Sequence, residues 1–134
     1  MTQLNTISNE EELERQLSEP TQRVIDTLSR LSGDLLILGA GGKMGPSLAR
    51  MAKRALESAG SRSKVIAVAR FSNETLRERL EAQGIETLAC DLTDAQQLAR
   101  LPDATHIVYM MGMKFGSTAR PADTWATNCL APYL

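Results

Sequence analysis

The feature that most constrains this chain is the stretch DLLILGAGGKMGPSLAR, residues 34–50. Four consecutive apolar residues, 35–38, lead directly into the pattern Gly-x-x-Gly-x-x-Gly, formed by Gly39, Gly42 and Gly45. The apolar run is typical of a strand that is buried on both faces, and the residues after the glycines have helical periodicity. A glycine-rich turn between such a strand and a helix predicts a site for an anion such as a phosphate.

Each glycine of the pattern has its own expected task. Gly39 allows a sharp turn off the strand, and Gly42 allows backbone N–H groups to approach a pyrophosphate with no Cβ between. Gly45 allows the helix to lie close to the sheet. The alternative is a tight turn without a ligand, but such a turn requires one glycine, and Gly41 makes four here.

The loop differs from two better-known phosphate motifs. It is not a P-loop, because Lys43 is followed by Met44 and not by Ser or Thr. Met44 also stands where Gly-x-Gly-x-x-Gly has its last glycine. Lys43 either adds charge near the phosphates or is a solvated lysine. The predicted phosphate-binding residues are Gly39, Gly41, Gly42, Lys43, Met44 and Gly45.

From residue 34 onward, predicted strands and helices alternate. Further strands are expected over residues 64–69, 86–90 and 106–110, and helices over 43–59, 73–83, 93–100 and from 122 to the end. Strands separated by helices require parallel pairing with right-handed crossovers. We therefore predict an α/β domain over residues 34–134, with a doubly wound parallel sheet of about four strands and flanking helices.

Residues 1–33 are predicted to form a helical N-terminal extension that packs on this domain. Ser8-Asn9-Glu10-Glu11 has the form of a capping box, and Leu13 and Leu17 share one face of the helix that follows. Pro20 allows a second helix to begin. Its apolar stripe consists of Val24, Ile25, Leu28 and Leu31.

With these motifs in place, the sequence resembles the extended short-chain dehydrogenase/reductases, also called the NAD-dependent epimerase/dehydratase family. Their first strand is followed by Thr-Gly-x-x-Gly-x-x-Gly, and Leu38 replaces the threonine here. Asp91-Leu92-Thr93-Asp94, after the third strand, is similar to a family motif beside the adenine ring. The resemblance covers residues 34–134 and implies a Rossmann-like fold that binds a nicotinamide dinucleotide.

Two weaker matches lie further along. The segment Val108 to Gly112, with Lys114, resembles the place where the family's chain passes beneath the cofactor ribose, and Asn128 matches an asparagine of the family's next helix. The resemblance implies that further cofactor-binding residues are Asp91, Leu92, Met111, Gly112 and Lys114.

The end of the second strand indicates which nicotinamide cofactor binds. An acidic residue there would bind the adenosine ribose 2′-hydroxyl and select NAD, but the sequence has Arg70. A guanidinium can bind a 2′-phosphate bidentately and stack on adenine, and Ser72 can add a donor. We predict NADP as the cofactor in preference to NAD. The alternative is that Arg70 only ends a strand in water.

The catalytic Tyr-x-x-x-Lys of the family is missing from this sequence. Tyr109 is followed four positions later by Met113, and Tyr133 is one residue from the end. The resemblance implies that the motif lies beyond Leu134, so we expect an N-terminal part, truncated before the fifth strand and inactive alone. His106, the single histidine, is expected to be a satisfied core or edge residue and not a general base.

Composition excludes several other functions. A net charge of −1 and 4% aromatic residues argue against nucleic acid as a partner. No apolar run approaches 18 residues and the N-terminus is not a signal peptide, so we predict a cytoplasmic protein without a membrane span. Cys90 and Cys129 lack metal-site spacing and are expected to be buried and reduced. The outer edge of the fourth strand predicts a homo-oligomer, unless a helix covers it.

The leading prediction is the dinucleotide-binding domain of an epimerase, dehydratase or reductase. Its small-molecule substrate would be a sugar nucleotide or a similar carbonyl or alcohol compound. The alternative is a non-catalytic Rossmann regulator that reads NADP(H) and signals through its helical extension. A third possibility is a domain that binds another adenine nucleotide, for instance in methyl transfer.

Overall fold

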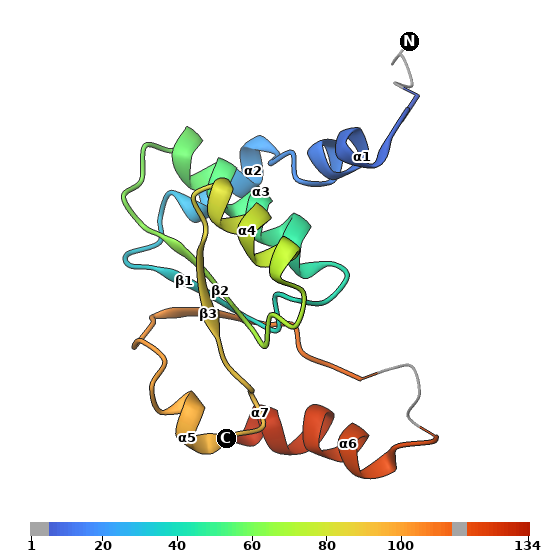
Figure 1. The fold of residues 1–134 in the computed structure, drawn as a ribbon. Coiled ribbons are helices and arrows are strands. Elements are labelled where there is room, and N and C mark those ends of the chain that lie inside the picture. The colour runs from blue at the N-terminus through green and yellow to red at the C-terminus, as the bar shows by residue number, and fades with distance from the viewer. Residues whose placement is uncertain (1–5, 114–117) are drawn as a thin grey trace.

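The computed structural model describes residues 6–113 and 118–134, and a four-stranded parallel sheet lies at its centre (Figure 1). The strand order is β3-β2-β1-β4. The strands are β1 (Leu35–Leu38), β2 (Val65–Ala69), β3 (Glu86–Ala89) and β4 (His106–Tyr109). This order confirms the predicted doubly wound α/β fold and equals the first part of the Rossmann strand order.

Helices cover both faces of the sheet. The helices α2 (Gln22–Leu28), α3 (Gly45–Ser58) and α4 (Glu74–Ala82) lie on one side (Figure 1). On the other side lie α5 (Ala95–Leu98) and a terminal helix made of α6 (Pro121–Trp125), a π-helical segment η1 (Ala126–Leu130) and α7 (Ala131–Tyr133). Because strand side chains alternate between faces, Ile37 joins the core cluster under α3 and Leu36 joins the opposite one.

The first helix, α1 (Glu10–Leu17), starts one residue later than the predicted capping box implied. Asn9 is the N-cap, and its side chain accepts a hydrogen bond of 2.8 Å from the Glu12 amide. The carboxylate that reaches back is that of Glu12, which accepts from both the amide and the hydroxyl of Ser8. Asparagine caps as well as serine does, so the box shifts by one position.

The contact between α1 and α3 is polar and does not use the predicted apolar face. The Ser47 hydroxyl donates to a Glu14 carboxylate oxygen at 2.9 Å. Arg54 donates to the Arg15 carbonyl oxygen at 3.0 Å and to the hydroxyl of the fully buried Ser18 at 3.3 Å. The apolar face of α1, which carries Leu13 and Leu17, remains exposed. In contrast, α2 packs its Leu28 against the core, as its apolar stripe predicts.

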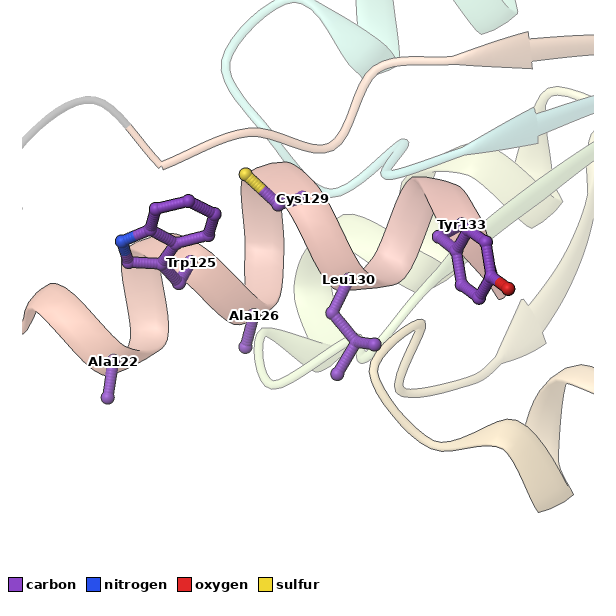
Figure 2. A pocket seen from close by; sticks show the side chains of 6 residues that line it. All are labelled: Ala122, Trp125, Ala126, Cys129, Leu130 and Tyr133. Atoms are coloured by element: carbon purple, nitrogen blue, oxygen red, sulfur yellow. The ribbon is translucent and has the colours of Figure 1, made fainter.

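The terminal helix presents apolar side chains outward. Trp125 and Tyr133 are 69% and 87% exposed. An open depression of about 530 Å³ is lined by Ala122, Trp125, Ala126, Cys129, Leu130 and Tyr133. Figure 2 shows that all of these side chains come from this helix. The expectation that both cysteines are buried is wrong for Cys129, which lies on this outer face, whereas Cys90 is buried. Among the helices of the described residues, none has both the length and the apolar character needed to cross a membrane.

Candidate functional site

A cavity of about 600 Å³ opens at the carboxyl ends of the strands. In a doubly wound sheet this is where ligands bind, because the chain leaves neighbouring strands β1 and β4 in opposite directions there. The loops after all four strands and the terminal helix contribute to its lining. The sequence-predicted residues that line it are Gly39, Gly41, Gly42, Arg70, Ser72, Asp91, Leu92, Met111 and Gly112.

The other predicted residues are placed differently. Lys43 and Met44 are exposed in the turn before α3, which starts at Gly45 and not at residue 43. Gly45 itself is buried and does not line the cavity. Lys114 lies outside the described residues.

Gly39 and Gly45 are required by the fold itself. Gly39 has a positive φ of 83°, and a Cβ there would lie 2.6 Å from the backbone nitrogen of Met111. A Cβ on Gly45 would lie 2.3 Å from the carbonyl oxygen of Ala40. The prediction that Gly45 allows the helix to lie close to the sheet is therefore wrong. The close approach at Gly45 is to the loop that precedes it.

Gly42 is different, because nothing in the fold requires glycine there. Its φ is outside the left-handed region, and the atom nearest to an added Cβ is the Gly39 carbonyl oxygen, at 3.6 Å. Gly42 is also exposed and faces the cavity. A side chain at this position of the cavity lining would therefore meet only an ordinary van der Waals contact within the protein.

Three backbone amides of the loop have acceptors within the protein. That of Gly42 donates to the Gly39 carbonyl oxygen at 3.3 Å. Those of Gly39 and Ala40 both donate to the Val68 carbonyl oxygen, at 2.9 and 3.0 Å, and so attach the loop to β2. In the described part of the chain, no acceptor is paired with the amides of Gly41 or Lys43. These amides and the N-terminus of α3 can donate to an anion.

The end of β2 brings two polar side chains to the cavity. Arg70 and Ser72 are both exposed and line it, and Phe71 between them has a positive φ of 48°. A non-glycine residue in this conformation is uncommon, and such residues concentrate at functional sites. The chain therefore turns sharply at Phe71, between the two candidate ligand-binding residues.

Asp91 faces Arg70 from the end of β3. Hydrogen bonds from the hydroxyl and the amide of Thr93, at 2.6 and 2.9 Å, lower the pKa of the Asp91 carboxyl, and the positive charge of Arg70 lowers it further. Both bonds end on Oδ1, so Oδ2 can accept from a ligand. Leu92 also lines the cavity, but its side chain is 3% exposed and belongs to the core.

Sequence reasoning missed the contribution of the terminal helix. Arg120, Asp123 and Thr127 line the cavity, and the first two form an ion pair. Their spacing puts Asp123 and Thr127 on one helical face, opposite the apolar outer face. The pattern that could have revealed them is a helix with a polar face toward the sheet and an apolar face toward solvent.

The side chains of Tyr109 and His106 are poorly suited to catalysis. Burial raises the pKa of Tyr109, whose hydroxyl donates to the Thr127 carbonyl oxygen at 3.3 Å. A catalytic tyrosine needs the opposite shift. His106 is not satisfied as expected: its Nε2 is buried and has no hydrogen-bond partner among the described residues.

The parallel β3-β2-β1-β4 sheet, the glycine-rich first loop and the cavity at the strand ends define a dinucleotide-binding α/β domain. A model of the NAD dependent epimerase/dehydratase family matches residues 35–133. The chain belongs to this family, which confirms the resemblance and implies a nicotinamide dinucleotide as the cofactor. A comparison with curated proteins gave no match.

Proposed function

We propose that this chain is the NADP-binding domain of an epimerase, dehydratase or reductase. The substrate class that family membership favours is a sugar nucleotide or a similar carbonyl or alcohol compound. The observation that carries the proposal is that nothing within the fold requires glycine at Gly42, which lines the cavity, whereas Gly39 and Gly45 of the same pattern are explained by the fold. A residue whose side chain is missing for no internal reason indicates a ligand that approaches the backbone.

The charges of the cavity support one orientation of the dinucleotide. Its pyrophosphate would lie on the amides of the glycine loop and at the N-terminus of α3. Its adenosine would lie toward Arg70, Ser72 and Asp91, where the guanidinium suits a 2′-phosphate and the free Asp91 oxygen suits a hydroxyl or amino donor. The nicotinamide, which supplies hydride transfer, would then lie toward Met111, Gly112 and the terminal helix.

Residues 1–134 would bind the cofactor without turning over substrate. Burial raises the pKa of Tyr109, which makes its hydroxyl a weaker acid than a free phenol, and that hydroxyl is engaged with the terminal helix. The position four residues later is Met113, which cannot lower that pKa as a lysine would. A test of this chain should therefore measure cofactor binding and not substrate turnover.

Calorimetric titration with NADPH, NADH and S-adenosylmethionine tests the proposal. We expect NADPH to bind most tightly and S-adenosylmethionine not to bind. The variant Gly42→Ala should bind NADPH at least about tenfold more weakly, because its Cβ occupies the space for the pyrophosphate. Tight binding of S-adenosylmethionine, or equal NADPH binding by Gly42→Ala, would contradict the proposal.

One observation favours the alternative of a non-catalytic NADP(H) sensor. Glu14 of α1 accepts from Ser47 in the first turn of α3, whose N-terminus faces the proposed pyrophosphate site. A sensor would change the solvent protection of α1 when NADPH binds, which hydrogen exchange measures. Unchanged exchange in α1 at saturating NADPH would argue for the enzyme domain.

We also propose that a second copy of this chain pairs along β4. Among the described strands, β4 is paired with β1 alone, so the groups along its outer edge are free to pair, and Ile107 is 55% exposed beside them. Antiparallel pairing about a two-fold axis would satisfy both edges at once. A net charge of −1 opposes this association little.

Sedimentation of Ile107→Lys tests this pairing, with Leu17→Lys as the matched control. Leu17 is 51% exposed, similar to Ile107, but lies on α1, remote from the β4 edge. Wild type and Leu17→Lys should sediment as dimers at about 50 µM, and Ile107→Lys as a monomer, because a charge on the edge opposes pairing. A monomeric wild type at that concentration would refute the pairing.

A further inference from the structure

The Gln97 side chain connects two acidic residues between β3 and α5. Its Oε1 accepts a hydrogen bond of 2.9 Å from the Asp91 amide, and its Nε2 donates to Asp94 Oδ2 at 2.9 Å. The reverse orientation of the carboxamide would set a donor against the Asp91 amide and an acceptor against the Asp94 carboxylate, so only one orientation satisfies both partners. Gln97 thus closes the loop that leads from β3 into α5.

The helix that carries Gln97 is itself fixed to the domain. Asp94 is the N-cap of α5, and its Oδ1 accepts from the amides of Gln96 and Gln97 at 2.9 and 3.3 Å. Leu98, the next residue, packs against the core cluster that contains Leu92. Because α5 is held at both of these points, the half-buried Gln97 side chain can fix the position of the loop that it reaches.

Asp91, the residue that Gln97 holds, lines the cavity, and most of its polar atoms are already bonded. Its amide donates to Gln97, and its carbonyl oxygen accepts from the Asp94 amide at 3.0 Å. Its Oδ1 accepts both hydrogen bonds from Thr93, and these bonds lower the pKa of the carboxyl, which favours its ionised form. Among the described residues, only Oδ2 of Asp91 lacks a partner, and an ionised carboxylate offers a ligand nothing but an acceptor.

An acceptor that is fixed in the cavity distinguishes one purine from another. The 6-amino group of adenine donates hydrogen bonds. Hypoxanthine carries an oxygen at the same position, and that oxygen can only accept. A free Asp91 amide would suit hypoxanthine, but the bond to Gln97 keeps this donor occupied. The contact therefore favours adenine in two ways, since it fixes an acceptor and withdraws a donor.

We propose that Gln97 is a positioning residue for base recognition: it holds Asp91 so that Oδ2 accepts from the 6-amino group of the cofactor's adenine. Gln97 does not line the cavity, so it acts through the backbone of Asp91. This inference rests on the proposed function, because it assumes that the adenosine of a dinucleotide lies beside Arg70 and Asp91.

The variants Gln97→Ala and Gln97→Met test the proposal, with Gln96→Ala as the matched control. Gln97→Met keeps the length of the side chain and removes both of its hydrogen-bonding groups. Gln96 is the neighbouring residue of α5, and its side chain is exposed. The readouts are the affinities for NADP⁺ and for its analogue with hypoxanthine in place of adenine, the exchange of the Asp91 amide proton, and the pKa of Asp94 by NMR titration.

Wild type should bind NADP⁺ at least about tenfold more tightly than the hypoxanthine analogue. We expect both Gln97 variants to bind NADP⁺ about fivefold more weakly than wild type and to bind the analogue within about twofold of wild type. Their Asp91 amide should exchange about tenfold faster. The pKa of Asp94 should rise in both, because the hydrogen bond from Gln97 is the contact that lowers it most. Gln96→Ala should match wild type in every measurement.

Three results would overturn the proposal. The first is an equal loss of affinity for NADP⁺ and the analogue in Gln97→Ala, which would indicate general damage to the loop. The second is wild-type behaviour of Gln97→Met, because packing and not hydrogen bonding would then be the role of Gln97. The third is equal binding of the two compounds by wild type, which would leave the proposed function intact. If wild type binds neither dinucleotide, the proposed function fails and this inference fails with it.

Discussion

Gly45→Ala is expected to lower the free energy of unfolding by about 3 kcal/mol or more. The added Cβ would lie 2.3 Å from the Ala40 carbonyl oxygen and 2.6 Å from the carbonyl carbon. The obstacle is backbone, which cannot change rotamer as a side chain does. Relief requires the loop after β1, or the start of α3, to move away from its core contacts.

Gly42→Ala is the matched control for this effect. An alanine there meets no atom closer than 3.6 Å and needs no left-handed backbone, so its free energy of unfolding should stay within about 0.5 kcal/mol of wild type. Urea unfolding with linear extrapolation measures both variants. Equal stability of Gly45→Ala and wild type would mean that the loop and α3 do not approach each other as closely as the structure has them.

Arg70→Asp is expected to change the ratio of NADPH to NADH affinity by about a hundredfold in favour of NADH. NADPH loses the charge-assisted hydrogen bonds to its 2′-phosphate and meets a negative charge in their place. NADH gains a carboxylate that accepts from the ribose 2′-hydroxyl. The nearby Asp91 carboxylate adds to the repulsion, and the hydrogen bonds from Thr93 that lower its pKa do not depend on Arg70.

The control for Arg70→Asp is the same substitution at Arg62. Arg62 is also exposed but lies just before β2, at the opposite end of that strand from Arg70. Both variants change the net charge equally, so Arg62→Asp isolates the effect of position from that of overall charge. Calorimetry at low and high salt should show the discrimination shrinking with ionic strength, as expected for exposed charges. An unchanged affinity ratio in Arg70→Asp would remove the basis for NADP selection.

Local sequence patterns were sufficient to predict the parallel sheet and the glycine-rich loop after its first strand. The strand at residues 35–38 and the helix after Gly45 follow from apolar periodicity and from the few conformations that glycine and proline permit. Parallel order follows in turn, because helical crossovers between strands leave few alternatives. The positions of Arg70 and Asp91 on the cavity also follow, since parallel strands place their carboxyl ends at one edge of the sheet.

Contacts between segments that are distant in the chain could not be predicted from local sequence patterns. Asn128 reaches Met113 across 15 residues, and Ser47 reaches Glu14 across 33. Neither pairing leaves a periodic trace in the sequence, because each depends on how two whole elements pack. The polar docking of α1 and the exposure of Cys129 are of the same kind.

By itself, therefore, the sequence determined the strand–helix alternation, the glycine turn and the charges at the strand ends, all of which arise from sterics and periodicity within a few residues. The tertiary structure alone decided that Gly45 is packed against Ala40, that Gly42 has no such close neighbour, and that the terminal helix closes the cavity with its polar face. The physical reason is that close packing is a property of elements brought together, and its distances are set only when the whole core assembles.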